Sequence, residues 1–502
     1  RQAQPRRAAV SAFGSGGTNA HGLLQEAPVA PASTPSTRPS QLLTVSARTP
    51  EALSAACARM ADHLRDGARG ADQSLADIAH TLRVGRRAFA HRRHIVAGDH
   101  AEAARLLADA AVLPTPAPVA GIVDIAFMCP GQGAQYAAMG RGLYDTEPEF
   151  RKAYDECCDL LAEDMGADPR TLFFSDAPET LTETRLTQPA IFALEYALAQ
   201  LWISWGVMPT ALIGHSVGEF VCAVLAGVMS LQDALALVAL RGRLMQAQPA
   251  GSMLSVRLSA TAIAPYLDDP SLHGAVELAA ENSPALCVVS GPAADIERLE
   301  ARLASDLVAA KRLVTSHAFH SAMMQPVIAP MRERLQTIAL QAPRIPILST
   351  VTGAWLSDAQ ACDPTYWAEH LRLPVRFAPA VSRLLESPGR VLLEIGPRAT
   401  LSTLARQCAA KGRGGQIAIA SLADSSGGES AAIAAALGQL WTAGGTPDWQ
   451  ACIAHESRRR VPLPGYAFQR QRHWIDATTQ TLSVDANTAA ADSDVATIDN
   501  AG

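Results

Sequence analysis

Hydrophobic positions along the chain alternate between two periods. Residues 41–47 and 91–98 have the apolar, β-branched composition of strands, and residues 50–65 repeat apolar positions at helical spacing, which predicts a small α/β unit. Further along, apolar strands alternate with longer helical segments. The predicted strands are 122–128, 210–214 and 391–395, and the predicted helices are 190–205, 217–226 and 231–246. This alternation predicts an α/β domain with a mostly parallel sheet covered by helices.

Residues 252–314 follow a different pattern. They are predicted to form a strand, a helix, two strands, a helix and a last strand at 310–315, an order typical of the ferredoxin-like split unit. We therefore expect a small subdomain, at about 250–315, inserted into the larger α/β domain.

Two proline-rich stretches indicate boundaries. PVAPASTPSTRPS (28–40) has the composition of an extended linker, and LPTPAP (113–118) precedes a buried strand that runs into a glycine turn. The last stretch has no Lys or Arg and many Ala and Thr, which predicts a disordered tail. The expected divisions of the chain are 1–28, 29–120, 121–415, 416–476 and 477–502.

Composition narrows the possible partners. The formal net charge of -6 provides no overall basic field to hold nucleic acid. No apolar run approaches the roughly 18 residues needed to cross a bilayer, so we expect a cytoplasmic protein without membrane contact. The nine cysteines lack metal-ligand spacing, which predicts reduced thiols and no metal site. The first residue is Arg rather than Met, so we expect a piece of a longer chain.

The sequence Gly214-His215-Ser216-Val217-Gly218 has the form of a nucleophile elbow. An apolar strand precedes it and a helical run follows, and the small residues on both sides of Ser216 suit the strained turn that exposes such a serine. The alternative is an ordinary glycine-rich turn between a strand and a helix. The flanking elements favour the elbow.

A serine nucleophile needs a base within hydrogen-bond reach, usually a histidine. Two candidates, His317 and His320, share one stretch after the predicted insert. No acid of a hydrolase triad stands at a recognisable strand end, so a Ser-His dyad oriented by a backbone carbonyl is preferred. Oxyanion donors are expected from the Val217 N–H at a helix start and the Gln132 N–H in a glycine turn.

Arg241 lies on an otherwise apolar helical run, LQDALALVALRGRLMQ. A guanidinium among apolar neighbours usually needs an anionic partner, and a free carboxylate on a substrate would supply one. The alternative is a salt bridge to an internal Glu or Asp. Spacing alone slightly favours that internal salt bridge.

These residues belong to a series of motifs that resembles the acyltransferase domain of type I polyketide synthases, itself similar to malonyl-CoA:acyl carrier protein transacylase. The resemblance covers about 121–415. Its motifs are PGQGAQ (130–135), TQPA (187–190), GHSVGE (214–219), RGRLM (241–245), NSP (282–284), HAFHS (317–321) and LEIGP (393–397). It implies an α/β-hydrolase-like large subdomain with a parallel sheet and an inserted ferredoxin-like small subdomain, flanked by a small α/β linker domain.

The resemblance also assigns roles. It implies Ser216 as nucleophile, His320 as base, Arg241 as the clamp on a malonyl carboxylate, and the N–H groups of Gln132 and Val217 as the oxyanion hole. No permanently bound cofactor is implied. Malonyl-CoA is the expected substrate, and the phosphopantetheine thiol of an acyl carrier protein is the expected acceptor.

Three further residues are expected at the substrate. They are His215 in the serine motif, Asn282 in NSP and Phe319 in HAFH. HAFH resembles the malonyl-selective form of a motif that reads YASH in methylmalonyl enzymes, because Phe319 would fill the volume that an α-methyl group occupies. The alternatives are the same chemistry with methylmalonyl-CoA, a serine hydrolase such as an editing thioesterase, and a non-catalytic docking module.

The flanks resemble other parts of the same synthase. Residues 6–28 resemble the C-terminal end of a ketosynthase, in which His21 lacks its cysteine partner, so no condensation is expected. Residues 41–112 are similar to the ketosynthase-to-acyltransferase linker, and 461–476 to the segment that follows the acyltransferase and folds back along the linker. Cys129 stands where the family usually has Phe, and we expect only a packing change. Expected partners are the carrier protein and the rest of the synthase, and the fragment is expected to be a monomer.

Overall fold

The computed structural model describes residues 4–27, 32–65, 73–119, 121, 123–175, 177, 180–272, 274–409 and 417–474. The chain divides into a large unit, Arg1–Ala467, and a short unit, Phe468–Gly502, whose described part contains no helix or strand. The tail predicted to be disordered at 477–502 lies outside the described residues.

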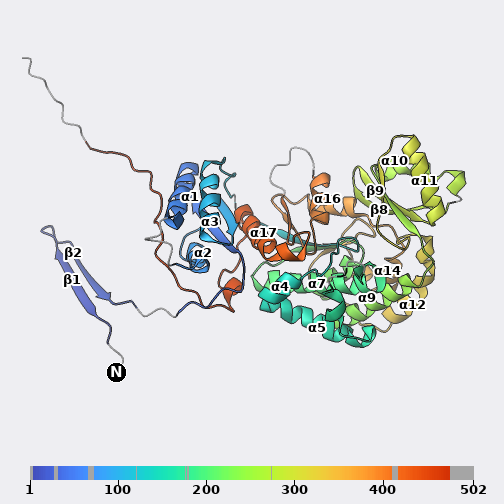
Figure 1. The fold of residues 1–502 in the computed structure, drawn as a ribbon, viewed down its shortest axis with the longest axis horizontal. Helices are drawn as coiled ribbons and strands as arrows, with labels where there is room; N and C mark the ends of the chain where they lie inside the picture. The colour runs from blue at the N-terminus through green and yellow to red at the C-terminus, as the bar shows by residue number, and fades with distance from the viewer. Residues whose placement is uncertain are drawn as a thin grey trace, which may run out of the picture. The chain divides into compact units, whose positions relative to one another are not determined.

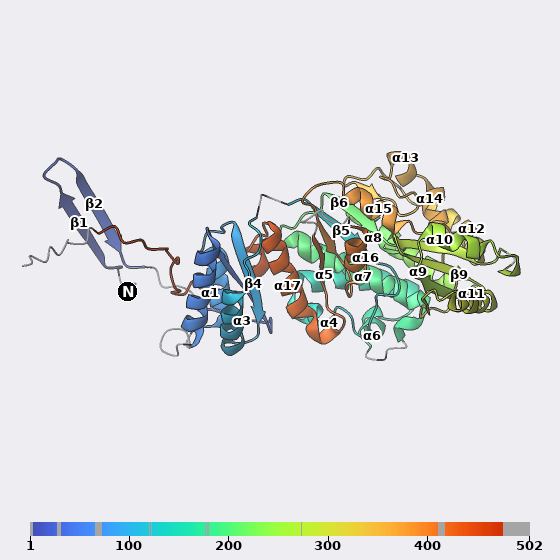
Figure 2. The ribbon, with the colours of Figure 1, turned by 90° about the horizontal axis from the view of Figure 1, so that it is seen from above.

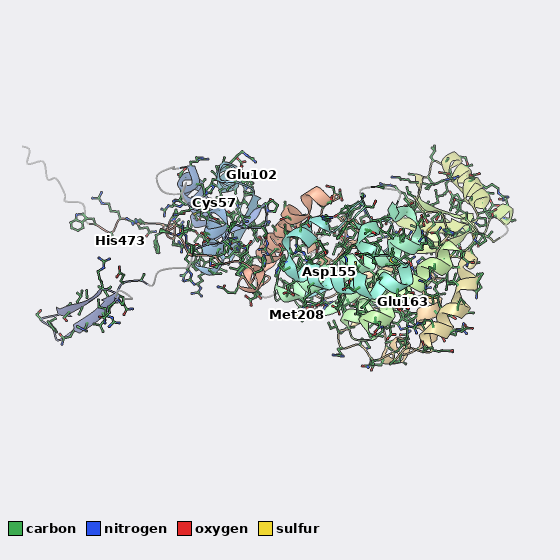
Figure 3. All side chains as sticks on the ribbon, turned by 60° about the horizontal axis from the view of Figure 1, so that its bottom comes forward. Cys57, Glu102, Asp155, Glu163, Met208 and His473 are labelled. Atoms are coloured by element: carbon green, nitrogen blue, oxygen red, sulfur yellow. The ribbon has the colours of Figure 1, made fainter. Side chains whose placement is uncertain are left out.

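A small α/β unit precedes the main domain, as the sequence predicts. Strand β3 (Gln41–Ala47) pairs antiparallel with β4 (His91–Ala97), and three helices pack around them (Figure 1): α1 (Pro50–Arg65), α2 (Leu75–Val84) and α3 (His100–Val112). Cys57 of α1, labelled in Figure 3, is fully buried in the core of this unit, whereas Glu102 of α3 is exposed. Upstream, β1 (Arg7–Phe13) and β2 (Asn19–Gln25) form an antiparallel hairpin of exposed residues.

A five-stranded sheet forms the centre of the main domain. Its strands, in the spatial order β11-β6-β5-β12-β13, all pair in parallel. They are β11 (Ile347–Leu348), β6 (Ala211–Gly214), β5 (Ile125–Cys129), β12 (Val391–Glu394) and β13 (Ile417–Ala420). β5, β6 and β12 are fully buried, as expected of strands covered on both faces. The predicted parallel α/β fold is therefore confirmed.

Helices cover this sheet, and α5, α7 and α9 pack against one another (Figure 2). The helix predicted at 190–205 begins six residues earlier, because the backbone N–H groups of Leu186 and Thr187 donate to the Glu183 carbonyl (2.9 Å each) and form a first turn before Pro189. The helices are α4 (Arg141–Thr146), α5 (Pro148–Met165), α6 (Pro169–Phe173), α7 (Thr184–Ser204), α8 (Gly218–Leu225), α9 (Leu231–Gln246), α12 (Gln325–Leu335), α13 (Asp358–Ala361), α14 (Pro364–Glu369), α15 (Phe377–Leu384), α16 (Thr400–Cys408) and α17 (Glu429–Ala443).

The predicted ferredoxin-like insert is present. Its elements are β7 (Ser252–Val256), α10 (Ala260–Leu267), β8 (Glu277–Ser283), β9 (Leu286–Gly291), α11 (Ala293–Ser305) and β10 (Ala310–Arg312). The strands form an antiparallel sheet in the order β10-β7-β9-β8, and α10 and α11 lie beside it (Figure 1). The strand predicted at 310–315 ends at Arg312, because a turn that joins the Thr315 N–H to the Leu313 carbonyl (3.0 Å) leads the chain out of the sheet.

The helix α17 and the segment after it contact the small α/β unit. Within α17, the carbonyl of Trp441 accepts a hydrogen bond from Arg92 (2.7 Å), and farther along, the Val461 N–H donates to the hydroxyl of Thr81 (2.9 Å). All nine cysteines are free thiols, and only Cys362 is exposed. In the part of the chain that the structure describes, no helix is both long and apolar enough to cross a membrane.

Candidate active site

A tight turn carries Ser216 from the end of β6 into α8. Ser216 has a φ of 53°, a left-handed conformation that a non-glycine residue adopts only when its surroundings hold it there. A Cβ atom on Gly218 would lie 2.1 Å from the Cys129 carbonyl oxygen, and one on Gly214 would lie 2.2 Å from the Glu219 nitrogen. The glycines of the motif are therefore required by close backbone approach, which is the geometry of a nucleophile elbow.

His320 is placed to act on Ser216. The Ser216 hydroxyl donates to Nε2 of His320 at 2.8 Å, and Nδ1 of His320 lies 2.7 Å from the carbonyl oxygen of Leu373. Because a carbonyl only accepts, Nδ1 carries the proton and leaves Nε2 as an acceptor. Burial lowers the pKa of His320 well below 6.5, and the charge of Arg241 lowers it further. His320 is therefore a neutral base at neutral pH.

His317, the other candidate, does not contact Ser216. Its Nε2 lies 3.1 Å from the Gln248 carbonyl oxygen, and its Nδ1 lies 2.7 Å from the hydroxyl of Ser316. It is buried with both ring nitrogens partnered. The structure thus separates the two histidines: His320 faces the nucleophile, and His317 has a structural position.

Arg241 of α9 reaches the same serine. Its Nη2 donates to Oγ of Ser216 at 3.2 Å and its Nη1 to Oε1 of Gln188 at 2.6 Å. Arg241 is 1% exposed, its Nε has no hydrogen-bond partner, and among the described residues no carboxylate forms an ion pair with it. The internal salt bridge that spacing favoured was therefore wrong. Burial lowers the pKa of Arg241 to about 9, so the side chain stays charged at neutral pH.

Gln188 is a residue that the sequence reasoning missed. It lies in the TQPA motif on α7, and its amide nitrogen is 3.3 Å from Oε1 of Gln132. A glutamine within a helical run that is otherwise mostly apolar was the signal available in the sequence. Gln188 therefore connects the guanidinium of Arg241 to the glycine turn at 131–133.

The two expected oxyanion donors lie beside the elbow. Gly133 adopts a φ of 115°, and its N–H is held by the side chain of Gln135 at 2.7 Å, which fixes the turn that contains Gln132. A Cβ on Gly131 would lie 3.4 Å from that of Ser216, so this turn passes close to the nucleophile. Within the described residues, the backbone N–H groups of Gln132 and Val217 donate to no backbone carbonyl.

The remaining expected residues lie where the insert meets the main domain. Nε2–H of His215 donates to Oδ1 of Asn282 at 3.0 Å, which joins the elbow to β8. Burial lowers the pKa of His215 below its ordinary value. Phe319, next to the base, is 8% exposed, and its carbonyl accepts from Ser290 of β9 at 2.8 Å. All of these residues therefore come from the junction of the two subdomains.

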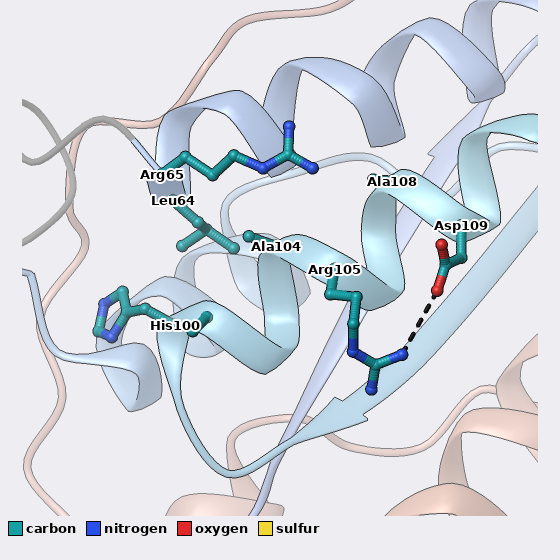
Figure 4. A pocket seen from close by; sticks show the side chains of 8 residues that line it. Leu64, Arg65, His100, Ala104, Arg105, Ala108 and Asp109 are labelled. Atoms are coloured by element: carbon teal, nitrogen blue, oxygen red, sulfur yellow. Dashed lines mark hydrogen bonds and ion pairs between the residues drawn. The ribbon is translucent and has the colours of Figure 1, made fainter.

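The site is distinct from a surface hollow in the small α/β unit. That hollow, of about 500 Å³, lies between α1 and α3 (Figure 4). Its lining includes His100 and an Arg105–Asp109 ion pair at 3.4 Å, and none of the residues around Ser216. Among the described residues, no group of three or more His, Cys, Asp or Glu side chains is placed to hold a metal ion.

Comparison with known proteins identifies the family to which the chain belongs. Residues 126–440 match the family model of the acyl transferase domain, and residues 41–107 match that of the CurL-like C-terminal region of polyketide synthases. The chain belongs to the acyl transferase domain family, in the form found in polyketide synthases. It is an acyltransferase.

Particular relatives agree with this. The chain is 39% identical to the polyketide synthase GfsA of Streptomyces halstedii over 93% of its own length. It spans 6% of GfsA and at most 32% of the first curated relatives that it matches. Among solved structures, the acyltransferase domain of ZmaA is 32% identical with a TM-score of 0.77, over 85% of this chain and 99% of that one. A malonyl CoA-acyl carrier protein transacylase from Burkholderia pseudomallei is 30% identical with a TM-score of 0.52, over 57% and 98%.

Proposed function

We propose that this chain transfers a malonyl unit from malonyl-CoA to the phosphopantetheine thiol of an acyl carrier protein, through a malonyl ester on Ser216. The observation that carries the proposal is the contact of one hydroxyl with both a neutral imidazole and a buried cation. Oγ of Ser216 lies 2.8 Å from His320 and 3.2 Å from Arg241.

In the first half-reaction, Oγ of Ser216 attacks the thioester carbonyl while its proton passes to Nε2 of His320. The tetrahedral intermediate collapses with cleavage of the carbon–sulfur bond. The leaving sulfur takes the proton from His320, so free coenzyme A departs and malonyl-serine remains. The Leu373 carbonyl on Nδ1 supports this step, because it stabilises the imidazolium that forms.

The N–H groups of Gln132 and Val217 are the proposed oxyanion donors. Val217 precedes the first turn of α8, where helix dipoles favour negative charge, and Gln132 lies in the turn that passes over Ser216. Donors fixed in this way stabilise the charge that develops on the carbonyl oxygen without reorganising during the reaction.

Arg241 is the proposed site for the free carboxylate of the malonyl group. A buried guanidinium without an anionic partner is costly, and a substrate carboxylate would form the paired, charge-assisted hydrogen bonds that it lacks. Gln188 holds the guanidinium from one side and leaves the remaining donors available. The carboxylate would thus be selected and oriented at the same time.

In the second half-reaction, the pantetheine thiol of the carrier protein gives its proton to His320 and attacks the malonyl ester. Ser216 leaves and recovers the proton, so the enzyme returns to its starting state. The proposed partners are therefore an acyl carrier protein and the rest of a polyketide synthase. Malonyl is proposed over methylmalonyl because bulky Phe319 directly precedes the base and is held by Ser290.

The experiment is a partition assay. The protein is incubated with malonyl-CoA and with holo carrier protein or, as a control, the apo form that lacks the thiol. The proposal predicts malonyl carrier protein only with the holo form, formed faster than free malonate. Release of malonate at the same rate with either form would instead indicate a hydrolase. Preferential transfer in a matched methylmalonyl-CoA assay would contradict the malonyl preference.

A further inference from the structure

A buried acid lies directly behind the nucleophile. Glu219, three residues after Ser216, is fully buried in the first turn of α8. Its Oε2 accepts from the N–H (3.1 Å) and the hydroxyl (2.7 Å) of Thr350, and its Oε1 accepts from the Tyr366 hydroxyl. The same Oε2 lies 3.3 Å from Nε2 of His370. Neither Glu219 nor His370 has a part in the chemistry described above.

Glu219 is held as an anion. Burial alone would raise its pKa, but His370 and the hydrogen bonds from Tyr366 and Thr350 keep the pKa below 4.5. A buried carboxylate with partners on both oxygens has one permitted position, because any shift leaves charge uncompensated. Thr350 also places its hydroxyl 3.0 Å from the carbonyl oxygen of Gly214, so the carboxylate is tied to the strand that enters the elbow.

His370 is held by both charge and packing. It is 1% exposed, stacks on Trp367 and meets the ring of Phe220 edge-on, with ring centroids 6.4 and 5.7 Å away. Its Nε2 is at ion-pair distance from Glu219 without hydrogen-bond alignment, and its Nδ1 has no partner among the described residues. Phe220 follows Glu219 on α8, so His370 docks onto the helix that begins at the nucleophile.

The residues after His370 hold the base. The carbonyl of Leu371 accepts from the backbone N–H of His320 at 3.3 Å, and the carbonyl of Leu373 accepts from Nδ1 at 2.7 Å. Within residues 366–373, Tyr366 and His370 therefore contact Glu219, and the next residues, Leu371 and Leu373, contact His320. Because the Glu219 N–H donates to the Ser216 carbonyl at 3.0 Å, this segment fixes the separation between the serine and the imidazole.

We propose that Glu219 and His370 form a positioning pair that holds His320 at hydrogen-bond distance from Ser216. Neither touches the acyl group; both act through the Leu371 and Leu373 carbonyls. The inference rests on the serine acylation proposed above. Because a misplacement of about 1 Å at a reacting centre can cost roughly 100-fold in rate, loss of the pair should slow acylation without weakening substrate binding.

The test compares Glu219→Gln, His370→Asn and the double variant by rapid-quench measurement of the acylation burst. The expected result is an acylation rate lowered about 10- to 100-fold in each single variant, with KM for malonyl-CoA changed less than about twofold. The loss should be equal for malonyl-CoA and acetyl-CoA. The double variant should be no slower than the worse single variant, since the two residues act as a unit.

The matched control is Glu195→Gln. Glu195 is another fully buried glutamate of the same domain, but neither of its oxygens has a partner among the described residues, and burial raises its pKa well above 4.5. Replacing Glu195 with a neutral amide should therefore leave the acylation rate unchanged.

Three results would overturn the inference. They are wild-type acylation rates in both pair variants, a lowered burst amplitude at unchanged rate, and losses that multiply in the double variant. If Glu219→Gln does not fold, His370→Asn alone carries the rate and KM test. Absence of a wild-type burst would refute the proposed function instead.

Discussion

Nη2 of Arg241 lies 3.2 Å from Oγ of Ser216, although the two residues are 25 positions apart, one in the turn before α8 and the other on α9. The guanidinium is kept there without an anionic partner among the described residues and with Gln188 as its main hydrogen-bond acceptor. A charged group left incomplete beside a nucleophile is expected where a ligand completes the pairing. This relationship connects the reactivity of the site to its substrate class.

Arg241→Ala should impair malonyl transfer far more than acetyl transfer. Removing one partner of a buried, hydrogen-bonded charge pair costs at least about 2 kcal/mol, so kcat/KM for malonyl-CoA should fall at least about 30-fold. Acetyl-CoA has no carboxylate and should lose much less. Arg243→Ala is the control, because Arg243 is on the same helix but pairs with Asp164 at the surface (3.1 Å). Equal losses for both acyl groups would remove Arg241 from carboxylate recognition.

Phe319→Ser should shift selectivity toward methylmalonyl-CoA. Room for one methyl group is worth about 1–3 kcal/mol, which predicts a rise of roughly 10- to 200-fold in the methylmalonyl-to-malonyl ratio. The ratio is measured with both substrates in competition. Phe319→Leu retains more of the side-chain volume and should shift the ratio less. An unchanged ratio in Phe319→Ser would show that this ring does not set selectivity.

The pH profile of acylation should reflect a depressed histidine pKa. His320 must be neutral to accept the serine proton, and burial together with Arg241, His370 and His215 lowers its pKa well below 6.5. As pH falls through 6.5 the base therefore stays neutral, and kcat/KM should remain flat until more acidic pH. An acidic limb centred at or above 6.5 would mean that the base is not in this environment.

Gly218→Ala should disrupt the elbow. The added Cβ would lie 2.1 Å from the carbonyl oxygen of Cys129 and 2.5 Å from that of Pro130, and these backbone atoms cannot turn aside as a flexible side chain could. We expect a loss of about 3 kcal/mol in the free energy of unfolding, measured by urea titration, and no acylation. Gly427→Ala is the control, because a Cβ there meets nothing within 4 Å, and its effect should stay within about 0.5 kcal/mol. Comparable stability of the two variants would contradict the packing argument.

The fold was predictable because its determinants are local. The strand before Ser216, the helix after it and the order of the insert all follow from hydrophobic periodicity, and the structure has them within a few residues. The start of α7 is an exception, because backbone hydrogen bonds to the Glu183 carbonyl form a helix turn before Pro189, a residue that usually marks a helix start.

The site was only partly predictable, because its contacts join distant segments. Motif spacing identified Ser216 and His320. It could not show that no carboxylate of the described residues pairs with Arg241, so the internal salt bridge was favoured wrongly. Glu219 belongs to the GHSVGE motif, but the motif gave it no role, and His370 gave no signal. One resembles an exposed residue in a first helical turn, the other is a single histidine, and 3.3 Å separates them only after folding.

The most direct test of the account is intact-protein mass spectrometry after mixing with malonyl-CoA, methylmalonyl-CoA and acetyl-CoA, followed by peptide mapping. The account predicts one malonyl adduct per chain on Ser216, formed in preference to the other two acyl groups and absent in Ser216→Ala. A malonyl adduct that persists in Ser216→Ala, or no adduct on the wild-type chain while malonyl still reaches a carrier protein, would contradict it.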